Sequence, residues 1–253
     1  MDLKLKDKVV LVTGGARGIG AAICRGFAAE GARVAVNYAS SKEKAERLAA
    51  DLADRYGVEV FAHGADIAVE AEIRSMFNAV EGRLGPVDVL VNNAALCPSG
   101  SIESYSVEKW EETFRVNVTA AFVCCREHVR RLRERGAEGK IVNIASQAAF
   151  LGSTSGHLPY DSSKGALVSM TRAVAREVAR EGINVNAVAP GMVLTEMVAG
   201  VLEKKKDFYL SRIPLGRIAE PEEIARVVVF LGSAAASYLT GTTLDLTGGL
   251  LMR

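Results

Sequence analysis

The chain has 253 residues, of which 49% are hydrophobic and 24% charged, and its formal net charge is +1. A chain of this length and composition is expected to fold around a sizeable core. The near-neutral charge gives it no general attraction to nucleic acid or to an anionic membrane, and no apolar run is long enough to cross a bilayer.

The first residues and the cysteines predict a cytoplasmic protein. Residues 1–8 are rich in charge and contain no apolar signal region. The four cysteines, Cys24, Cys97, Cys124 and Cys125, include no Cys-x-x-Cys pair. We interpret them as reduced thiols and predict no metal site.

The chain opens with a strand, a glycine-rich turn and a helix. The strand is predicted over Lys8–Val12 and the helix over Ala21–Glu30, with Thr13–Gly20 between them. Glycines let backbone approach a phosphate, and the amides at a helix start attract an anion. The spacing is Gly-x-x-x-Gly-x-Gly rather than the general Gly-x-Gly-x-x-Gly. A plain turn is therefore the alternative, but the flanking strand and helix favour nucleotide binding.

A second strand, Arg33–Asn37, completes a βαβ unit. NAD-binding chains usually carry an acid at the end of this strand for the ribose hydroxyls, whereas this chain continues through Asn37 to Ser40 without one. Because no carboxylate there would repel a 2′-phosphate, and Arg17 and Lys42 offer positive charge, we predict a preference for NADP(H). NAD(H) stays possible, since the two cations would otherwise be ordinary surface residues.

The next elements are predicted as a helix at 42–56, a strand at 58–62, a helix at 69–84 and a strand at 87–91. Asp66 either caps the second of these helices or lies against the adenine. His63 is interpreted as structural. Asn92 and Asn93 end the fourth strand, where asparagine often satisfies loop backbone.

One long helix is predicted from Val107 to about Arg135, with Ser106 as its cap. Asn117 lies in its apolar middle, where an asparagine is unfavourable unless it has a partner. The strand that follows ends at Ser146, and ligands of parallel sheets lie beyond the carboxyl ends of the strands. The Ser146 hydroxyl could therefore hold a substrate carbonyl, with an ordinary turn serine as the alternative.

Tyr160 and Lys164 are four residues apart at the start of a predicted helix, so their side chains share one face. An ammonium beside a phenol favours the phenolate, so we expect Lys164 to lower the pKa of Tyr160. A phenol tuned in this way can exchange a proton with a carbonyl or an alcohol. Taken alone, the pair is weak evidence, because Tyr and Lys at this spacing usually belong to a solvated helix face.

The remaining elements are a strand at 184–189, a helix at 221–233 and a strand at 243–246. The alternation of strands and helices predicts an α/β fold, a Rossmann-type doubly wound parallel sheet of about seven strands with helices on both faces. No repeat or linker divides the chain, so we expect one domain over 1–253.

Three motifs in this order give the chain a family resemblance. Thr13-Gly14-x-x-x-Gly18-x-Gly20, Asn92-Asn93-Ala94 and Tyr160-x-x-x-Lys164 resemble the short-chain dehydrogenase/reductase superfamily over essentially the whole sequence. The resemblance implies that Ser146, Tyr160 and Lys164 are catalytic, and that Asn117 holds a water on a proton path from Lys164 to solvent. It implies a substrate lid at about 193–213. The implied cofactor contacts are Gly14, Arg17, Gly18, Ile19, Gly20, Asn37, Ser40, Asp66, Ile67, Asn93, Ala94, Tyr160, Lys164, Pro190, Gly191, Val193 and Thr195.

The implied reaction is hydride transfer between a nicotinamide and a carbonyl or secondary alcohol of a small molecule. Within the family the chain looks most similar to 3-oxoacyl-(acyl carrier protein) reductases and broad ketoreductases. Glu181 argues against carrier-protein docking, because those reductases can carry a basic residue there. A sugar or polyol dehydrogenase is the alternative, and a non-catalytic nucleotide-binding regulator is a more distant one.

Two further expectations follow from the resemblance. Helices 107–135 and 160–181 would pack on their copies in a homotetramer. The segment 147–159 is one residue longer than in many relatives and carries Phe150, Leu151, His157 and Leu158, so it is expected to alter the substrate pocket. Phe150 and Leu158, together with Met192 and Val193, favour a partly apolar substrate, and His157 either touches substrate or lies outside.

Overall fold

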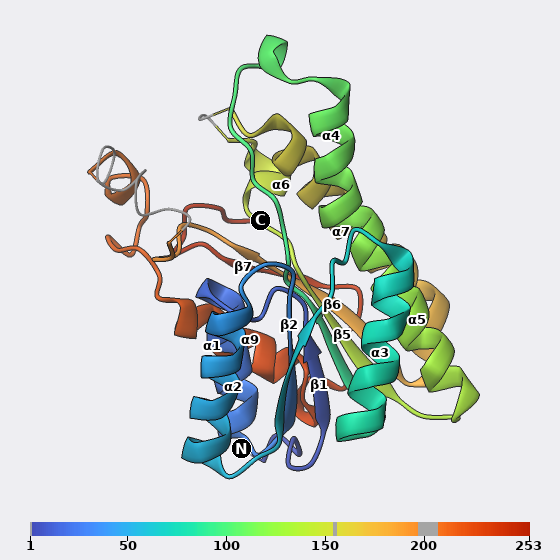
Figure 1. Ribbon diagram of the computed structural model, residues 1–253. Coiled ribbons are helices and arrows are strands. Elements are labelled where there is room, and N and C mark those ends of the chain that lie inside the picture. The colour runs from blue at the N-terminus through green and yellow to red at the C-terminus, as the bar shows by residue number, and fades with distance from the viewer. Residues whose placement is uncertain (1, 154–155, 197–206) are drawn as a thin grey trace.

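The computed structural model describes residues 2–153, 156–196 and 207–253. Within them, seven strands form one parallel sheet in the order β3-β2-β1-β4-β5-β6-β7 (Figure 1). The predicted Rossmann-type fold is confirmed. The strands β1 to β7 span Val9–Val12, Arg33–Tyr38, Val60–Gly64, Val89–Asn92, Gly139–Ile144, Ile183–Pro190 and Thr243–Leu246.

Helices cover both faces of the sheet (Figure 1). One face carries α1 (Gly18–Ala29), α2 (Lys42–Tyr56) and α9 (Pro221–Leu231), and the other carries α3 (Glu70–Leu84), α5 (Ala120–Glu134) and α7 (Leu158–Val178). Val10 and Val12 of β1 pack in the first core, and Val9 and Leu11 in the second, as the two-residue period of a strand requires. Shorter helical segments are α4 (Val107–Phe114), α6 (Ala148–Leu151), Ile102–Ser104, Ala179–Glu181 and Ala234–Ala236.

The strand order reverses beside β1, and this reversal determines where a ligand can bind. The chain moves outward from β1 to β2 and β3, and then returns to β4 on the other side of β1. The connections after β1 and β4 therefore diverge and leave a crevice at the carboxyl edge of the sheet.

The predicted long helix 107–135 is interrupted. α4 ends at Phe114, a single π turn spans Arg115–Thr119, and α5 begins at Ala120. The predicted cap is confirmed, since the Ser106 hydroxyl accepts a hydrogen bond from the Lys109 amide at 3.2 Å. The π turn contains Asn117, whose side chain is held by residues outside the helix.

The structure also bears on the cysteines, on membrane-spanning helices, on metal sites and on the predicted lid. All four cysteines are free thiols. In the described part of the chain, no helix combines the length and apolar character that a bilayer crossing needs, and no group of His, Cys, Asp or Glu side chains is arranged to hold a metal ion. Residues 197–206, about half of the predicted lid at 193–213, lie outside the described residues.

Candidate active site

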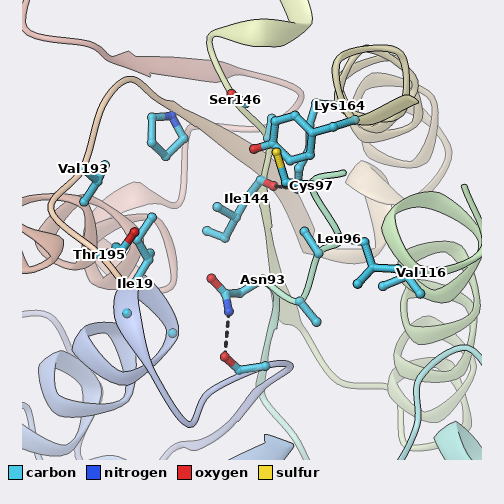
Figure 2. Close-up of a pocket in the computed structure, with 18 of the residues that line it drawn as sticks. Ile19, Asn93, Leu96, Cys97, Val116, Ile144, Ser146, Lys164, Val193 and Thr195 are labelled. Carbon is cyan, nitrogen blue, oxygen red and sulfur yellow. Dashed lines mark hydrogen bonds between the residues drawn. The ribbon is translucent and has the colours of Figure 1, made fainter. Parts of the chain in front are cut away.

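A cleft of about 970 Å³ opens at the carboxyl edge of the sheet. It is lined by every residue predicted to contact the cofactor and by Ser146, but not by Asn117. Figure 2 shows Ser146 and Lys164 on one side of this pocket, with Ile19, Thr195 and Asn93 across from them. The cleft therefore joins a catalytic end to a glycine-turn end.

The glycine turn has a backbone that only glycines allow, and without side chains its amides can approach a phosphate group closely. Gly14 and Gly18 have φ of +61° and +52°, which only glycine adopts without strain. A Cβ on Gly20 would lie 2.3 Å from the Gly14 carbonyl oxygen and 2.7 Å from Asn93 Nδ2. No side chain caps the first amides of α1, so these donors remain available to an anion.

Asn93 and Thr13 brace this turn from β4 and β1. Asn93 Nδ2 donates to the carbonyls of Thr13 and Gly14, at 3.0 and 2.9 Å, and Figure 2 shows the Asn93 side chain pointing to this turn. Thr13 Oγ1 in turn accepts from the amides of Asn93 and Ala94, at 3.0 and 3.2 Å. The interpretation of a strand-end asparagine that satisfies loop backbone is thus confirmed for Asn93.

Asn37 lines the cleft, but its side chain hydrogen-bonds to protein backbone and does not point freely into the cleft. Its Oδ1 accepts from the Gly14 amide at 3.3 Å and its Nδ2 donates to the Ala65 carbonyl at 3.1 Å. The surface after β2 is instead extended by Tyr38, Ala39 and Ser41, which line the cleft together with the predicted Ser40. Their position directly after a predicted strand was the available signal for them.

Asp66 does not cap α3. Its Oδ1 accepts from the Ala68 amide at 2.9 Å, and its own amide donates to Glu72 Oε2 at 2.7 Å. The N-cap of α3 is Val69, with no side-chain hydrogen bond. The capping alternative is therefore wrong, because α3 starts too late for Asp66 to reach its amides, and Asp66 lies on the cleft wall.

The charges at the glycine-turn end differ from the prediction in one residue. Arg17 lines the cleft, whereas Lys42 does not and lies 3.8 Å from Glu46 on its own helix. The predicted contribution of Lys42 is not supported. Sequence reasoning missed Glu196, which lines the cleft, and Lys44, which does not line it but whose Nζ lies 2.8 Å from a carboxylate oxygen of Glu196.

The catalytic end is built from α7 and the end of β5. Tyr160 and Lys164 share a face of α7, with Lys164 Nζ 5.6 Å from the centre of the Tyr160 ring. Lys164 Nζ donates to the Ile144 carbonyl at 2.6 Å. Ser146 follows β5, is 8% exposed, and its hydroxyl accepts from the Ala148 amide at 3.1 Å. The three predicted catalytic side chains therefore line one wall.

The electrostatics of this end differ from the sequence-based expectation. Burial raises the pKa of Tyr160 above its ordinary value, and an interaction with Ser146 only partly opposes the rise. Burial also lowers the pKa of Lys164 to about 8. The predicted lowering of the Tyr160 pKa by Lys164 is not found in the chain itself, because loss of water dominates and the amine bonds to Ile144.

Asn117 is buried behind the cleft, and its side chain has the partners that its position required. Its Oδ1 accepts from the Leu96 amide at 2.8 Å, and its Nδ2 donates to the Leu96 carbonyl and to Ser163 Oγ, both at 2.9 Å. Ser163 Oγ donates to the Tyr160 carbonyl at 2.7 Å. The π turn is thereby joined to α7 through Ser163, a residue that the sequence analysis did not single out.

His157 lies on the cleft wall, where a substrate could reach it. Its Nδ1 is 2.8 Å from the Pro98 carbonyl and 3.7 Å from Cys97 Sγ. Burial raises the pKa of Cys97 to about 11, so this thiol is protonated at neutral pH. Phe150 stacks under Arg253 at 3.5 Å, whereas Leu151, Met192, Tyr209 and Leu250 give the substrate end an apolar wall.

Comparisons with known proteins agree over nearly the whole chain. Residues 14–251 match the family model described as enoyl-(acyl carrier protein) reductase. The 3-oxoacyl-[acyl-carrier-protein] reductase FabG of Aquifex aeolicus is 38% identical over 252 residues, which are 99% of this chain and 100% of that protein.

Solved structures are similar to the same extent. A short-chain type dehydrogenase/reductase from Mycobacterium marinum superposes with a TM-score of 0.94 at 31% identity, covering 100% of this chain and 99% of that one. L-Sorbose reductase from Gluconobacter frateurii, complexed with NADPH and L-sorbose, superposes with a TM-score of 0.92 at 31% identity and covers 100% of both chains.

Proposed function

The chain belongs to the short-chain dehydrogenase/reductase family, and on that premise we propose that it is an NADP(H)-dependent ketoreductase that also oxidises secondary alcohols. One observation carries the proposal: Ser146, Tyr160 and Lys164 line the same cleft as the glycine turn. A regulator that only binds nucleotide would have no need of these three side chains.

The residues present fit a dinucleotide. The uncapped start of α1 and the crowded glycine turn suit a pyrophosphate. Pro190, Gly191, Val193 and Thr195 line the part of the cleft that the family resemblance assigns to the nicotinamide. When bound, the cofactor supplies or accepts the hydride.

The chain itself supplies a proton and a place for the substrate oxygen. Burial keeps the Tyr160 phenol protonated at neutral pH, which suits it to donate a proton to a carbonyl oxygen. The Ser146 hydroxyl can hold the same oxygen. Lys164 is largely protonated below pH 8, and its charge favours the phenolate that remains after the proton leaves. Oxidation of an alcohol runs these steps in reverse.

We propose that Asn117 and Ser163 hold the Tyr160 backbone in position. They connect the π turn to the Tyr160 backbone by two hydrogen bonds of 2.9 and 2.7 Å. The predicted water on Asn117, and a proton path to solvent through Lys164, stay a proposal.

The preference for NADP(H) is supported by charge. No acid follows β2 between Asn37 and Ser41, and Arg17 lines the cleft beside them. The NADPH complex of the similar sorbose reductase fits the same preference. NAD(H) is the second candidate, and a comparison of kcat/KM for NADPH and NADH tests the choice.

A free ketone or short acyl substrate fits better than one attached to a carrier protein. Glu181 binds Arg133 through two contacts of 2.8 Å, so the surface where related reductases can be basic is neutralised. The apolar wall of Leu151, Met192 and Leu250 accommodates a partly apolar substrate. The second candidate is a sugar or polyol dehydrogenase, favoured by the likeness to L-sorbose reductase.

The single domain, the substrate lid and the homotetramer remain part of this proposal. Sedimentation of the purified protein tests the tetramer. Limited proteolysis with and without NADPH tests a lid at 193–213, since a closed lid would be protected.

The decisive experiment is Tyr160→Phe, assayed over a panel of ketones with NADPH. The substitution removes only the hydroxyl, so turnover should fall by about 10³-fold while cofactor affinity changes little. Substantial residual kcat would contradict the assignment of Tyr160 as proton donor. If the wild-type protein binds NADPH but does not turn it over with any ketone or alcohol tested, the result would favour the non-catalytic regulator.

A further inference from the structure

Three charged side chains meet at the glycine-turn end of the cleft, and together they form what we call the charge clasp: Arg17, Lys44 and Glu196. Lys44 Nζ lies 2.8 and 3.0 Å from the two carboxylate oxygens of Glu196. Arg17 Nη1 lies 3.9 Å from Glu196 Oε2. The Lys44 ammonium holds the pKa of Glu196 below its usual range, so the carboxylate is charged at neutral pH.

The clasp joins three separate parts of the fold. Arg17 belongs to the glycine turn, Lys44 to the first turn of α2, and Glu196 to the chain that follows β6. Thr195 lies against the glycine turn, since a Cβ on Gly18 would meet Thr195 Cγ2 at 3.4 Å. Glu196, the next residue, therefore lies close enough to the turn for its carboxylate to be 3.9 Å from Arg17.

The clasp also borders the place where the two nicotinamide cofactors differ. Arg17, Ser40, Ser41 and Glu196 all line the cleft. Ser40 and Ser41 follow β2, and in this fold the end of that strand lies beside the ribose 2′ position. A 2′-phosphate would enter where the clasp already holds an anion between two cations.

We propose that Glu196 is a specificity-determining residue whose carboxylate takes the position between Arg17 and Lys44 that the 2′-phosphate of NADPH would otherwise occupy. The inference rests on the proposed NADP(H) preference and deepens it. Binding of NADPH must displace the carboxylate from its cations, whereas NADH has no group to compete with it. Lys44, rather than the predicted Lys42, supplies the second cation.

The expected effect is modest because the clasp faces solvent. The side chains of Arg17 and Glu196 are 62% and 63% exposed, and exposed ion pairs contribute little. Removing the Glu196 charge should therefore tighten NADPH relative to NADH by about three- to tenfold, and less at high salt. Selectivity of this kind comes from a built-in repulsion as well as from attraction.

The test measures binding rather than turnover. NADPH, NADH, adenosine 2′,5′-bisphosphate and AMP are titrated into the full chain by calorimetry at low and high salt. Glu196→Gln should raise the preference for the 2′-phosphorylated member of each pair by about three- to tenfold. Lys44→Gln should lower it by a similar factor. Lys42→Gln is the matched control, since Lys42 pairs with Glu46 outside the cleft, and should leave both ratios unchanged.

Each other outcome overturns a distinct claim. Equal tightening of both cofactors in Glu196→Gln would mean that Glu196 acts on the shared pyrophosphate, and would overturn the specificity role. An unchanged ratio in both Glu196→Gln and Lys44→Gln, with binding intact, would overturn it as well. Wild-type protein that binds neither cofactor would overturn the proposed function first, and the inference with it.

Discussion

The two ends of the cleft are built from different kinds of interaction. At the catalytic end, Ser146, Lys164 and Asn117 are 8%, 2% and 2% exposed, and hydrogen bonds to backbone or buried groups hold them. At the other end, Arg17 and Glu196 are mostly exposed and are held by ion pairs. Proton transfer needs atoms fixed within tenths of an ångström, which buried hydrogen bonds provide. Discrimination between cofactors needs only a difference in charge, which a solvated rim supplies.

The largest effect is expected from removing Lys164, the buried amine of the catalytic end. Lys164→Met should lower kcat/KM for ketone reduction by about 10²- to 10⁴-fold, because the charge that favours the Tyr160 phenolate is lost. The same substitution should stabilise the protein at pH 7. Folding lowers the pKa of Lys164 from 10.5 to about 8, so its buried charge costs up to about 3 kcal/mol below pH 8.

The pH dependence gives this prediction its sign. Between pH 8 and 10.5 the folded amine is neutral while the unfolded one keeps its proton, so the cost fades as pH rises through that window. Denaturation of wild type and Lys164→Met across this window should show the stability gap closing, and taking the difference cancels the cysteines that also titrate there. A variant less stable than wild type at pH 7 would contradict the view that the catalytic end is strained by its buried charge.

Local patterns in the sequence predicted the catalytic end better than the rim. The four-residue spacing of Tyr160 and Lys164 fixes a shared helix face, and Ser146 follows from the end of a strand. The inward turn of Asn37 depends on the Gly14 amide and the Ala65 carbonyl, which only the folded sheet brings together. Likewise, the partner of Lys44 lies 152 positions away. No local sequence pattern predicts such long-range contacts.

The broken helix at Asn117 shows the same limit. Residues 107–135 have a continuous helical pattern that does not indicate the π turn at Arg115–Thr119, where Leu96 and Ser163 hold the Asn117 side chain. Sequence indicated that Asn117 needed a partner. The identity of that partner, and the helix distortion that accommodates it, are tertiary effects.

A buried histidine on α5 gives a second test of the comparison. His128 is fully buried beside Phe77, and neither ring nitrogen makes a well-aligned hydrogen bond among the described residues. Burial and the nearby Arg135 lower its pKa to about 3, and the backbone of Lys140 and Asp88 only partly opposes this shift. Because the unfolded histidine takes up a proton below about pH 6.5, stability should be lost as pH falls, by about 2 kcal/mol between pH 7 and pH 5.

His128→Leu should remove this acid limb of the stability curve. The control is His63→Gln, because His63 is only partly buried and burial lowers its pKa less, so its effect between pH 5 and 7 should be smaller. Urea unfolding at pH 5 and pH 7 measures both. An acid limb that is unchanged in His128→Leu would mean that other groups cause it.

Ser163→Ala tests whether the buried hydrogen bonds position the chemistry as well as stabilise the fold. The substitution leaves Asn117 Nδ2 without one of its two acceptors and should cost about 1–2 kcal/mol of stability. It should also lower kcat about tenfold with little change in the KM for NADPH, because it shifts the Tyr160 backbone rather than the cofactor site. Ser162→Ala is the neighbouring control. A stability loss with unchanged kcat and pH profile would reduce Ser163 to a structural residue.

The smallest effect is expected at an exposed ion pair far from the cleft. Glu181→Gln removes the partner that binds Arg133 at 2.8 Å, yet stability should change by less than about 1 kcal/mol because the pair is solvated. Turnover of a free ketone should also stay the same.

The informative measurement is the KM for a carrier-linked 3-oxoacyl thioester, compared with the KM for the free thioester. If Glu181 keeps carrier proteins away, the variant should gain on the carrier-linked substrate alone, since Arg133 then keeps only its longer contact of 3.5 Å with Glu177 and its charge is less fully neutralised. Glu134→Gln, which leaves Arg130 on the same helix with Glu127 as its remaining partner, controls for a general gain in positive charge, and an equal gain in that control would mean that no specific docking surface lies at Glu181.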